Sequence, residues 1–148
     1  MTSPSDTEAG RSSASALFPA GHARPLRVLV VDDHLLARCA IRWQLQEMSG
    51  LNVVGEAVDG FEAVALTRTL SPDLVFMDIR MPGLDGLEAT RRITAEHPHV
   101  RVIILSSFEG EPYRSAAREA GAAAYLVKGQ TIPHVAAALQ QIFGVSET

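Results

Sequence analysis

The sequence is poor in the residues and segments that build secreted or membrane proteins. It has a single cysteine, Cys39, so an internal disulfide framework is excluded. Because Cys39 lies within an apolar helical pattern, we expect it in the core. No run approaches the ~18 apolar residues of a membrane span, and the N-terminus lacks the basic start and apolar run of a secretory signal. These absences predict a cytoplasmic protein without a membrane partner.

Clustered basic residues are also lacking. The net charge is −4, and Arg91-Arg92 is the only adjacent basic pair. A nucleic-acid-binding surface needs clustered Lys and Arg, so we expect no direct nucleic acid binding by this chain. Lysine is rarer still, since Lys128 is the only one beside twelve arginines. That scarcity makes Lys128 a poor candidate for generic surface charge.

The 148 residues suit one folded domain between two tails. Residues 1–25 mix Ser, Thr and Pro with few apolar residues, which predicts a disordered N-terminal tail. We place the domain at 26–144 and a short C-terminal tail at 145–148. Within the domain, strand-like and helix-like patterns alternate five times. The expected strands are 26–31, 52–58, 74–77, 101–105 and 123–127, and the expected helices are 34–48, 60–70, 85–97, 110–120 and 131–143.

This alternation predicts an α/β fold with a doubly wound parallel sheet between two helical layers. The strand order does not follow from the alternation. At the helix ends, Asp85 and Thr131 are expected as N-caps and Gly121 as a left-handed C-cap. In the last helix, Ile132, Val135, Leu139 and Ile142 form an expected core stripe.

Four of the strand-like runs end in a polar residue. Asp32-Asp33, Asp78, Ser106 and Lys128 follow the first, third, fourth and fifth runs. An open parallel sheet gathers the carboxyl ends of its strands along one edge, where ligand sites form. Three carboxylates there would repel one another unless a cation lies among them, and Mg²⁺ prefers such oxygen ligands. The sequence therefore predicts a magnesium site completed by a phosphoryl group.

Each of these residues also has a purely structural interpretation. Asp33 would serve only as the N-cap of the helix that starts at His34. We assign no ligand role to His34. Ser106 would be a turn hydroxyl, Lys128 a solvated strand end, and Tyr125 a core side chain. Asp78 has the stronger context, because Pro82 and Gly83 force a loop that leaves its carboxylate at the edge of the sheet. A carboxylate so placed can attack phosphorus and form an acyl phosphate.

The motifs Val30-Val-Asp-Asp-His34, Met77-Asp-Ile-Arg-Met-Pro-Gly-Leu-Asp-Gly86, Leu105-Ser106 and Tyr125-Leu-Val-Lys128 occur in this order. In sequence and spacing they resemble the receiver domains of bacterial two-component response regulators. The likeness covers roughly residues 26–144 and is closest to regulators with a helix-turn-helix output domain. The resemblance implies a flavodoxin-like (βα)5 fold with strand order 2-1-3-4-5.

The same resemblance implies roles for individual residues. Asp78 would accept a phosphoryl group from a sensor histidine kinase. Asp33 and Asp78 would bind Mg²⁺ through their carboxylates, with Asp32 helping through water and the Arg80 carbonyl as a further ligand. Ser106 and Tyr125 would form the switch pair, and Lys128 would sense the phosphoryl group. The chain departs from many receivers in having Gly129 where they have proline, and Arg80 and Phe108 occupy positions that vary in the family.

We therefore expect a phosphorylation-dependent signalling switch of a phosphorelay, not an enzyme. The stretch Ala136–Ala138 and Gln140-Gln141 lack charge, so the last helices are expected to dock to a second copy or to a downstream protein. One alternative is a fragment or shortened relative of a DNA-binding transcription regulator. A further alternative is a phosphatase that forms an aspartyl phosphate. It is disfavoured because such enzymes usually have a second acid two residues after the nucleophile, and that position is Arg80 here. A receiver that never accepts phosphate conflicts with the complete set of polar residues.

Overall fold

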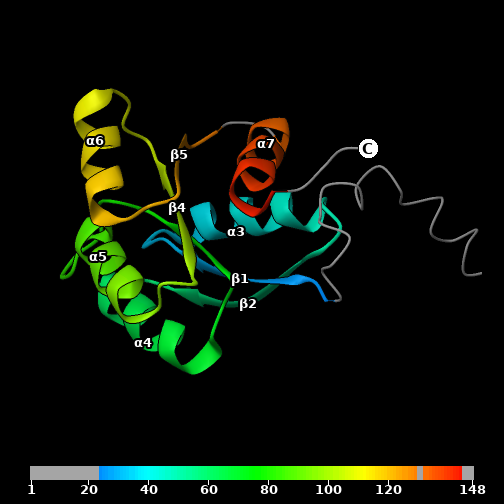
Figure 1. Ribbon diagram of the computed structural model, residues 1–148, viewed down its shortest axis with the longest axis horizontal. Helices are drawn as coiled ribbons and strands as arrows, with labels where there is room; N and C mark the ends of the chain where they lie inside the picture. Colours follow the sequence, from blue (N-terminus) through cyan, green and yellow to red (C-terminus); the bar gives the residue numbers. More distant parts are fainter. Residues whose placement is uncertain (1–23, 130–131, 145–148) are drawn as a thin grey trace, which may run out of the picture.

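The computed structural model describes residues 24–129 and 132–144. Elements carry the labels of Figure 1. The strands are β1 (Leu26–Val31), β2 (Leu51–Ala57), β3 (Leu74–Met77), β4 (Arg101–Ser106) and β5 (Ala124–Val127), and the helices are α3 (Leu35–Gln46), α4 (Gly60–Leu70), α5 (Gly86–Glu96), α6 (Glu111–Ala120) and α7 (Ile132–Phe143). Each expected strand and helix is present, with ends that agree with the predicted ones to within two residues. The predicted tails, 1–25 and 145–148, lie almost wholly outside the described residues.

The five strands form one parallel sheet in the order β2-β1-β3-β4-β5. This is the order that the resemblance implied. Two helices, α3 and α7, cover one face, and α4, α5 and α6 cover the other (Figure 1). The reversal of strand order between β1 and β3 places their carboxyl ends side by side, so the loops after them flank a common crevice.

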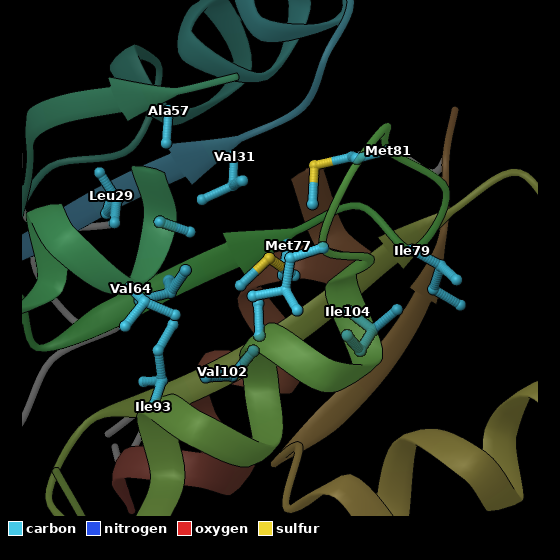
Figure 2. Packing of buried hydrophobic residues seen from close by; sticks show 14 of the residues in the cluster. Leu29, Val31, Ala57, Val64, Met77, Ile79, Met81, Ile93, Val102 and Ile104 are labelled. Carbon is cyan, nitrogen blue, oxygen red and sulfur yellow. The ribbon is translucent and has the colours of Figure 1, made fainter. Parts of the chain in front are cut away.

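The alternation of side chains along the central strands divides the core in two. Residues facing α4, α5 and α6 form the larger cluster, in which Met77 and Ile93 are fully buried (Figure 2). Residues facing α3 and α7, such as Phe76 and Leu139, form the second cluster. Because both faces of β3 are buried, this strand is continuously apolar, as the sequence indicated.

Local side-chain chemistry sets several helix ends. The Asp85 carboxylate accepts a hydrogen bond from the Glu88 amide at 2.9 Å, which confirms the predicted cap of α5. Gly121 ends α6 with φ of 100°, a left-handed conformation that favours glycine. The predicted cap Thr131 lies outside the described residues.

One expectation about α3 is wrong, and one structural alternative is not found. Cys39 is exposed, because it lies on the side of α3 opposite the buried Ile41 and Leu45. The apolar pattern in this helix is broader than the stripe that the sheet covers, and Cys39 falls in the uncovered part. Asp33 does not cap the helix, since His34 occupies the N-cap position and its amide donates to Asp32 Oδ1 at 2.9 Å.

In α7, Val135 and Leu139 are buried in the second cluster, as the stripe predicted. Ile142 is partly buried against the same cluster, and the side chain of Ile132 lies outside the described set. Across the described helices, none combines the length and apolar character that a bilayer crossing requires.

Candidate functional site

Backbone hydrogen bonds between neighbouring strands fix the polar residues at the edge of the sheet. The amide of Asp32 donates to the Ala57 carbonyl at 3.1 Å, and that of Asp78 donates to Val31 at 3.0 Å. The Lys128 amide donates to the Ser106 carbonyl at 2.8 Å. Each residue thus continues the ladder of its strand by one position. The rigid sheet, not a loop, determines where these side chains begin.

Lys128 connects the acidic residues from different strands. Its Nζ lies 2.6 Å from Asp32 Oδ2 and 3.4 Å from Asp78 Oδ1. Burial by itself would lower the pKa of the ammonium group, but the hydrogen bond that it donates to Asp32 and the charges of both carboxylates raise the pKa above its ordinary value. The lone lysine is therefore a charged contact inside the site, in agreement with the compositional argument.

Asp78 has only part of its charge compensated. Burial, followed by the charge of Asp32, raises the pKa of Asp78 to about 6, although Lys128 and the Ile79 amide act in the opposite direction. That amide donates to Asp78 Oδ1 at 3.0 Å. Asp32 is also fully buried, and the carboxylates of Asp32 and Asp78 share the single ammonium group of Lys128. The site has an excess of negative charge.

Asp32, Asp33 and His34 bring potential metal ligands together within 4.8 Å of one another. Asp33 Oδ1 is buried, and its one close polar neighbour given by the described residues is His34 Nδ1, at 3.1 Å. A buried carboxylate oxygen without a hydrogen-bond donor from the backbone is the arrangement that a cation would stabilise. The potential metal ligands are mostly oxygen atoms and lie next to the uncompensated charge of Asp78, so their chemistry fits Mg²⁺.

The loop between β3 and α5 closes tightly over the acidic residues. The Gly86 amide donates to the Ile79 carbonyl at 2.8 Å, and a Cβ at Gly86 would lie 1.8 Å from the Asp78 carbonyl oxygen. Only glycine permits this approach. The loop brings Arg80 to the same open depression as Asp33, which places its backbone close to the predicted metal ligands.

The predicted switch residues meet at the backbone of Phe108. Ser106 is fully buried, and its Oγ accepts a hydrogen bond from the Phe108 amide at 3.1 Å. Tyr125 is also buried, and its hydroxyl donates to the Phe108 carbonyl at 2.5 Å. The Arg80 guanidinium lies 4.5 Å from the centre of the Phe108 ring. The turn-hydroxyl and core interpretations of Ser106 and Tyr125 thus describe this conformation correctly, and they are compatible with a switch role.

Two residues of the site were missed in the sequence. Arg38 donates to the Asp32 carbonyl at 2.9 Å and pairs with Glu56 at 2.8 Å, so it holds the end of β1. Phe108 was noted only as a variable position, yet its backbone contacts both switch residues. Only a weak signal in the sequence points to Arg38 as a residue of the site: it follows His34 by four residues and lies on a polar side of α3. A backbone contact such as that of Phe108 leaves no signal in residue type.

Comparison with known proteins assigns the chain to a family that agrees with the observed fold and with the polar residues at the edge of the sheet. The family model described as the response regulator receiver domain matches residues 28–140. The chain belongs to this family of receiver domains.

The relatives agree with this assignment. The chain is 42% identical over 118 residues to the response regulator GacA of Pseudomonas aeruginosa and to UvrY of Escherichia coli K12, which covers 80% of this chain. The same alignments cover 55% and 54% of those relatives, so the chain spans about half their length. The resemblance to regulators with helix-turn-helix output domains is confirmed by these relatives.

Solved structures give the same result. A two-component response regulator of the LuxR family from Aurantimonas superposes with a TM-score of 0.76 at 35% identity, over 81% of this chain and 86% of that one. The response regulator domain of Thermotoga maritima CheB gives a TM-score of 0.75 at 34% identity, over 83% and 99%. These similarities establish the fold and the class of the domain.

Proposed function

We propose that the chain is a cytoplasmic protein that accepts a phosphoryl group on Asp78 from a sensor histidine kinase and thereby switches its surface. The observation that carries this proposal is the Lys128 ammonium group placed between Asp32 and a buried, incompletely compensated Asp78. The Asp78 carboxylate oxygen attacks phosphorus, the bond to the donor histidine nitrogen breaks, and that nitrogen keeps the electron pair. The acyl phosphate remains on Asp78.

The described residues support the distribution of roles. Asp33 and Asp78, with Asp32 and the Arg80 carbonyl, would hold Mg²⁺, which supplies positive charge that offsets the charge developing on the phosphoryl oxygens. Lys128 is already charged and near Asp78, so it needs no proton transfer to pair with the incoming phosphoryl group. With a pKa of about 6, Asp78 is mostly ionised at neutral pH, as a nucleophile must be.

The switch would begin at Ser106. In the described conformation its hydroxyl is bonded to the Phe108 amide, and Tyr125 is already buried against the Phe108 carbonyl. A phosphoryl group on Asp78 offers the Ser106 O–H a charged acceptor, which the Phe108 amide, a donor, does not provide. When Ser106 turns toward it, the Phe108 backbone loses one of its two anchors. This shifts the β4–α6 loop and the face formed by β5 and α7.

Intact mass after incubation with acetyl phosphate and Mg²⁺ tests the acceptor. The parent is expected to gain one phosphoryl group and Asp78→Asn none. Folded parent protein without added mass would contradict the proposal, and labelling retained in Asp78→Asn would move the acceptor to another residue.

Beryllofluoride, a mimic of the bound phosphoryl group, tests the switch separately. Its addition with Mg²⁺ is expected to perturb the amide resonances of Phe108, Tyr125 and α7. Binding confined to the acidic residues, with these resonances unchanged, would leave the acceptor in place and overturn the switch.

A further inference from the structure

One apolar motif interrupts the polar residues at the start of the chain. Residues 14–20 read Ala-Ser-Ala-Leu-Phe-Pro-Ala and carry no charge, whereas the residues before them include two acids and an arginine. Phe18 is the only Phe, Tyr or Trp that precedes β1. The motif lies outside the described residues. A short apolar stretch within a polar segment is typical of a chain that orders when it binds a surface.

A groove of matching character lies between α3 and α7. Its volume is about 130 Å³, close to the ~150 Å³ of a cavity that holds a benzene ring, so it suits one phenyl ring. Both helices pack on the same face of the sheet (Figure 1). The apolar lining comes from α3, β4, β5 and α7, through Ala37, Ala40, Ile41, Leu105, Leu126 and Val135.

The surface beside the groove is apolar as well. Leu36, Ala40 and Trp43 follow one another along α3 at helical spacing, and the exposed fractions are 80% for Leu36 and 68% for Trp43. A leucine and a tryptophan on one stripe exceed the scattered apolar residues that are normal on a surface. None of the described residues covers them.

Charge is nearly absent from this face. Helix α7 contains no Asp, Glu, Lys or Arg. On α3, Arg38 and Arg42 both pair with Glu56 of β2, at 2.8 and 3.1 Å. Among the residues that line the groove only Lys128 is charged, and it is already paired with a carboxylate of the acidic site. The groove therefore offers apolar contact without a free ionic partner, which fits an uncharged segment.

The apolar motif is attached within reach of the groove. The Leu26 amide donates to the Gly50 carbonyl at 2.8 Å, so β1 begins beside the loop that follows α3 (Figure 1). The eight residues from Phe18 to Leu26 span up to about 26–29 Å when extended. From Gly50 back to Ala40 the path is at most about 23 Å, which is ~14 Å of loop and ~9 Å of helix. The Phe18 ring can therefore reach the lining residues on α3.

We propose that residues 14–20 of the same chain occupy this groove, with the Phe18 ring between α3 and α7 and the flanking apolar residues against Trp43. Attachment favours this occupant over a separate molecule, because a short flexible link gives an effective concentration of about 1 mM. A contact with a dissociation constant of only about 0.1 mM is then formed in about nine-tenths of the molecules.

The docked segment is a built-in competitor for the face formed by α3 and α7. A partner of this face must first displace it, so the apparent affinity of that partner falls by the uncovered fraction, about tenfold here. The significance of this competition for signalling rests on the function proposed above. The docking itself does not, and it is expected whether or not Asp78 accepts phosphate.

Nuclear magnetic resonance spectra of the full chain test the docking. Phe18→Ser removes the ring, and since residue 18 precedes β1 the circular dichroism spectrum is expected to stay unchanged. The amide resonances of Ala40, Gln44 and Val135 are expected to shift relative to the parent, and the emission of Trp43, the only tryptophan, to move to longer wavelength. Identical spectra of the two proteins overturn the proposal.

A matched pair of variants locates the docking site. A nitroxide on Cys39, the only cysteine and an exposed one, is expected to broaden the amide resonances of residues 16–20 in the parent. Ala40→Arg puts a charge at the groove and is expected to remove most of this broadening. Ala65→Arg makes the same change at an exposed alanine of α4, on the other side of the sheet, and is expected to retain it. Equal broadening in Ala40→Arg and the parent excludes the groove.

Dilution distinguishes the chain's own segment from that of another molecule. The spectral differences between the parent and Phe18→Ser are expected to be the same at micromolar and near-millimolar protein. Differences that vanish on dilution overturn the proposal in favour of a contact between copies.

The dye anilinonaphthalene sulfonate, a probe of exposed apolar surface, tests the competition. It is expected to bind Phe18→Ser about tenfold more tightly than the parent, and to bind Ala65→Arg like the parent. Equal affinity for the parent and Phe18→Ser overturns the competition. Failure of Asp78 to accept phosphate would be seen by mass, independently of all these results.

Discussion

At the scale of single residues, the site is a small set of buried charges that do not balance. Asp32 and Asp78 share Lys128, and Asp33 lies beside Asp32. Burial makes each charge expensive, so the arrangement persists only because the strands fix where the side chains start. The charge imbalance suits the uptake of a cation and of a phosphoryl group that we propose.

Asp78 is expected to lower the stability of the fold at neutral pH. Its pKa is about 6 in the folded chain against 3.8 for the ordinary group, so between these values the folded state binds more protons than the unfolded one. The contribution of this group to stability therefore falls as pH rises from about 4 to 6 and stays low above it. We expect Asp78→Asn to raise the free energy of unfolding at pH 7.5 by about 1–3 kcal/mol.

Urea unfolding of both proteins at pH 7.5 and pH 5 measures this effect, and the difference should be smaller at pH 5. Glu109→Gln makes the same change in net charge at an exposed position and is the control. An Asp78→Asn variant that is no more stable than the parent at pH 7.5 would contradict the raised pKa.

Lys128 is expected to act in the opposite direction. Lys128→Met leaves Asp32 and Asp78 without their ammonium partner, and a buried carboxylate left unpaired costs about 2–4 kcal/mol of stability. Urea unfolding at pH 7.5 measures the loss. Adding Asp78→Asn to Lys128→Met should recover part of it, since one of the two unpaired charges is then removed. Strictly additive effects of the two substitutions would mean that these side chains do not interact.

At the scale of elements, close backbone contacts hold the loops in place around the site. Gly86 begins α5 and lets the loop from β3 return against the Asp78 carbonyl. Gly60 does the same at the start of α4, where its amide donates to the Leu84 carbonyl at 3.1 Å. The two helix starts and the loop therefore form one packed unit beside the acceptor.

We expect Gly86→Ala to destabilise the chain by about 3 kcal/mol or more, because the added Cβ would lie 1.8 Å from the Asp78 carbonyl oxygen and the backbone would have to move. The urea midpoint measures this. Gly129→Ala is the comparison, since its Cβ meets no atom within 4 Å and only the φ of 90° opposes it, at a cost of about 1 kcal/mol. Equal losses in the two variants would show that the contact at Gly86 is relaxed in solution.

At the scale of the whole molecule, binding at the acidic residues is linked to global stability. A cation that binds only the folded chain stabilises it by about 1.4 kcal/mol when present at ten times its dissociation constant. We expect millimolar Mg²⁺ to raise the melting temperature and Asp33→Asn to remove most of that rise. Scanning calorimetry with and without Mg²⁺ measures it. Na⁺ at equal ionic strength is the control, and an equal rise with Na⁺ would indicate screening alone.

The sequence by itself determined the alternation of strands and helices, the caps Asp85 and Gly121, and the polar residues at the ends of four strands. These features are local, because burial on both faces, capping and turns each leave a pattern within a few residues. The lone lysine and the order of the motifs then assigned the chain to a family. Asp78, Lys128 and Ser106 could be chosen as site residues for that reason.

Only the tertiary structure decided which residues meet. Cys39 was expected in the core, but the sheet covers a narrower part of α3 than its apolar pattern suggests. The contact of Phe108 with Ser106 and Tyr125 is made by its backbone, which every residue type has. The shared partner of Asp32 and Asp78 depends on how β1, β3 and β5 are ordered, and strand order is a long-range choice that local patterns do not encode.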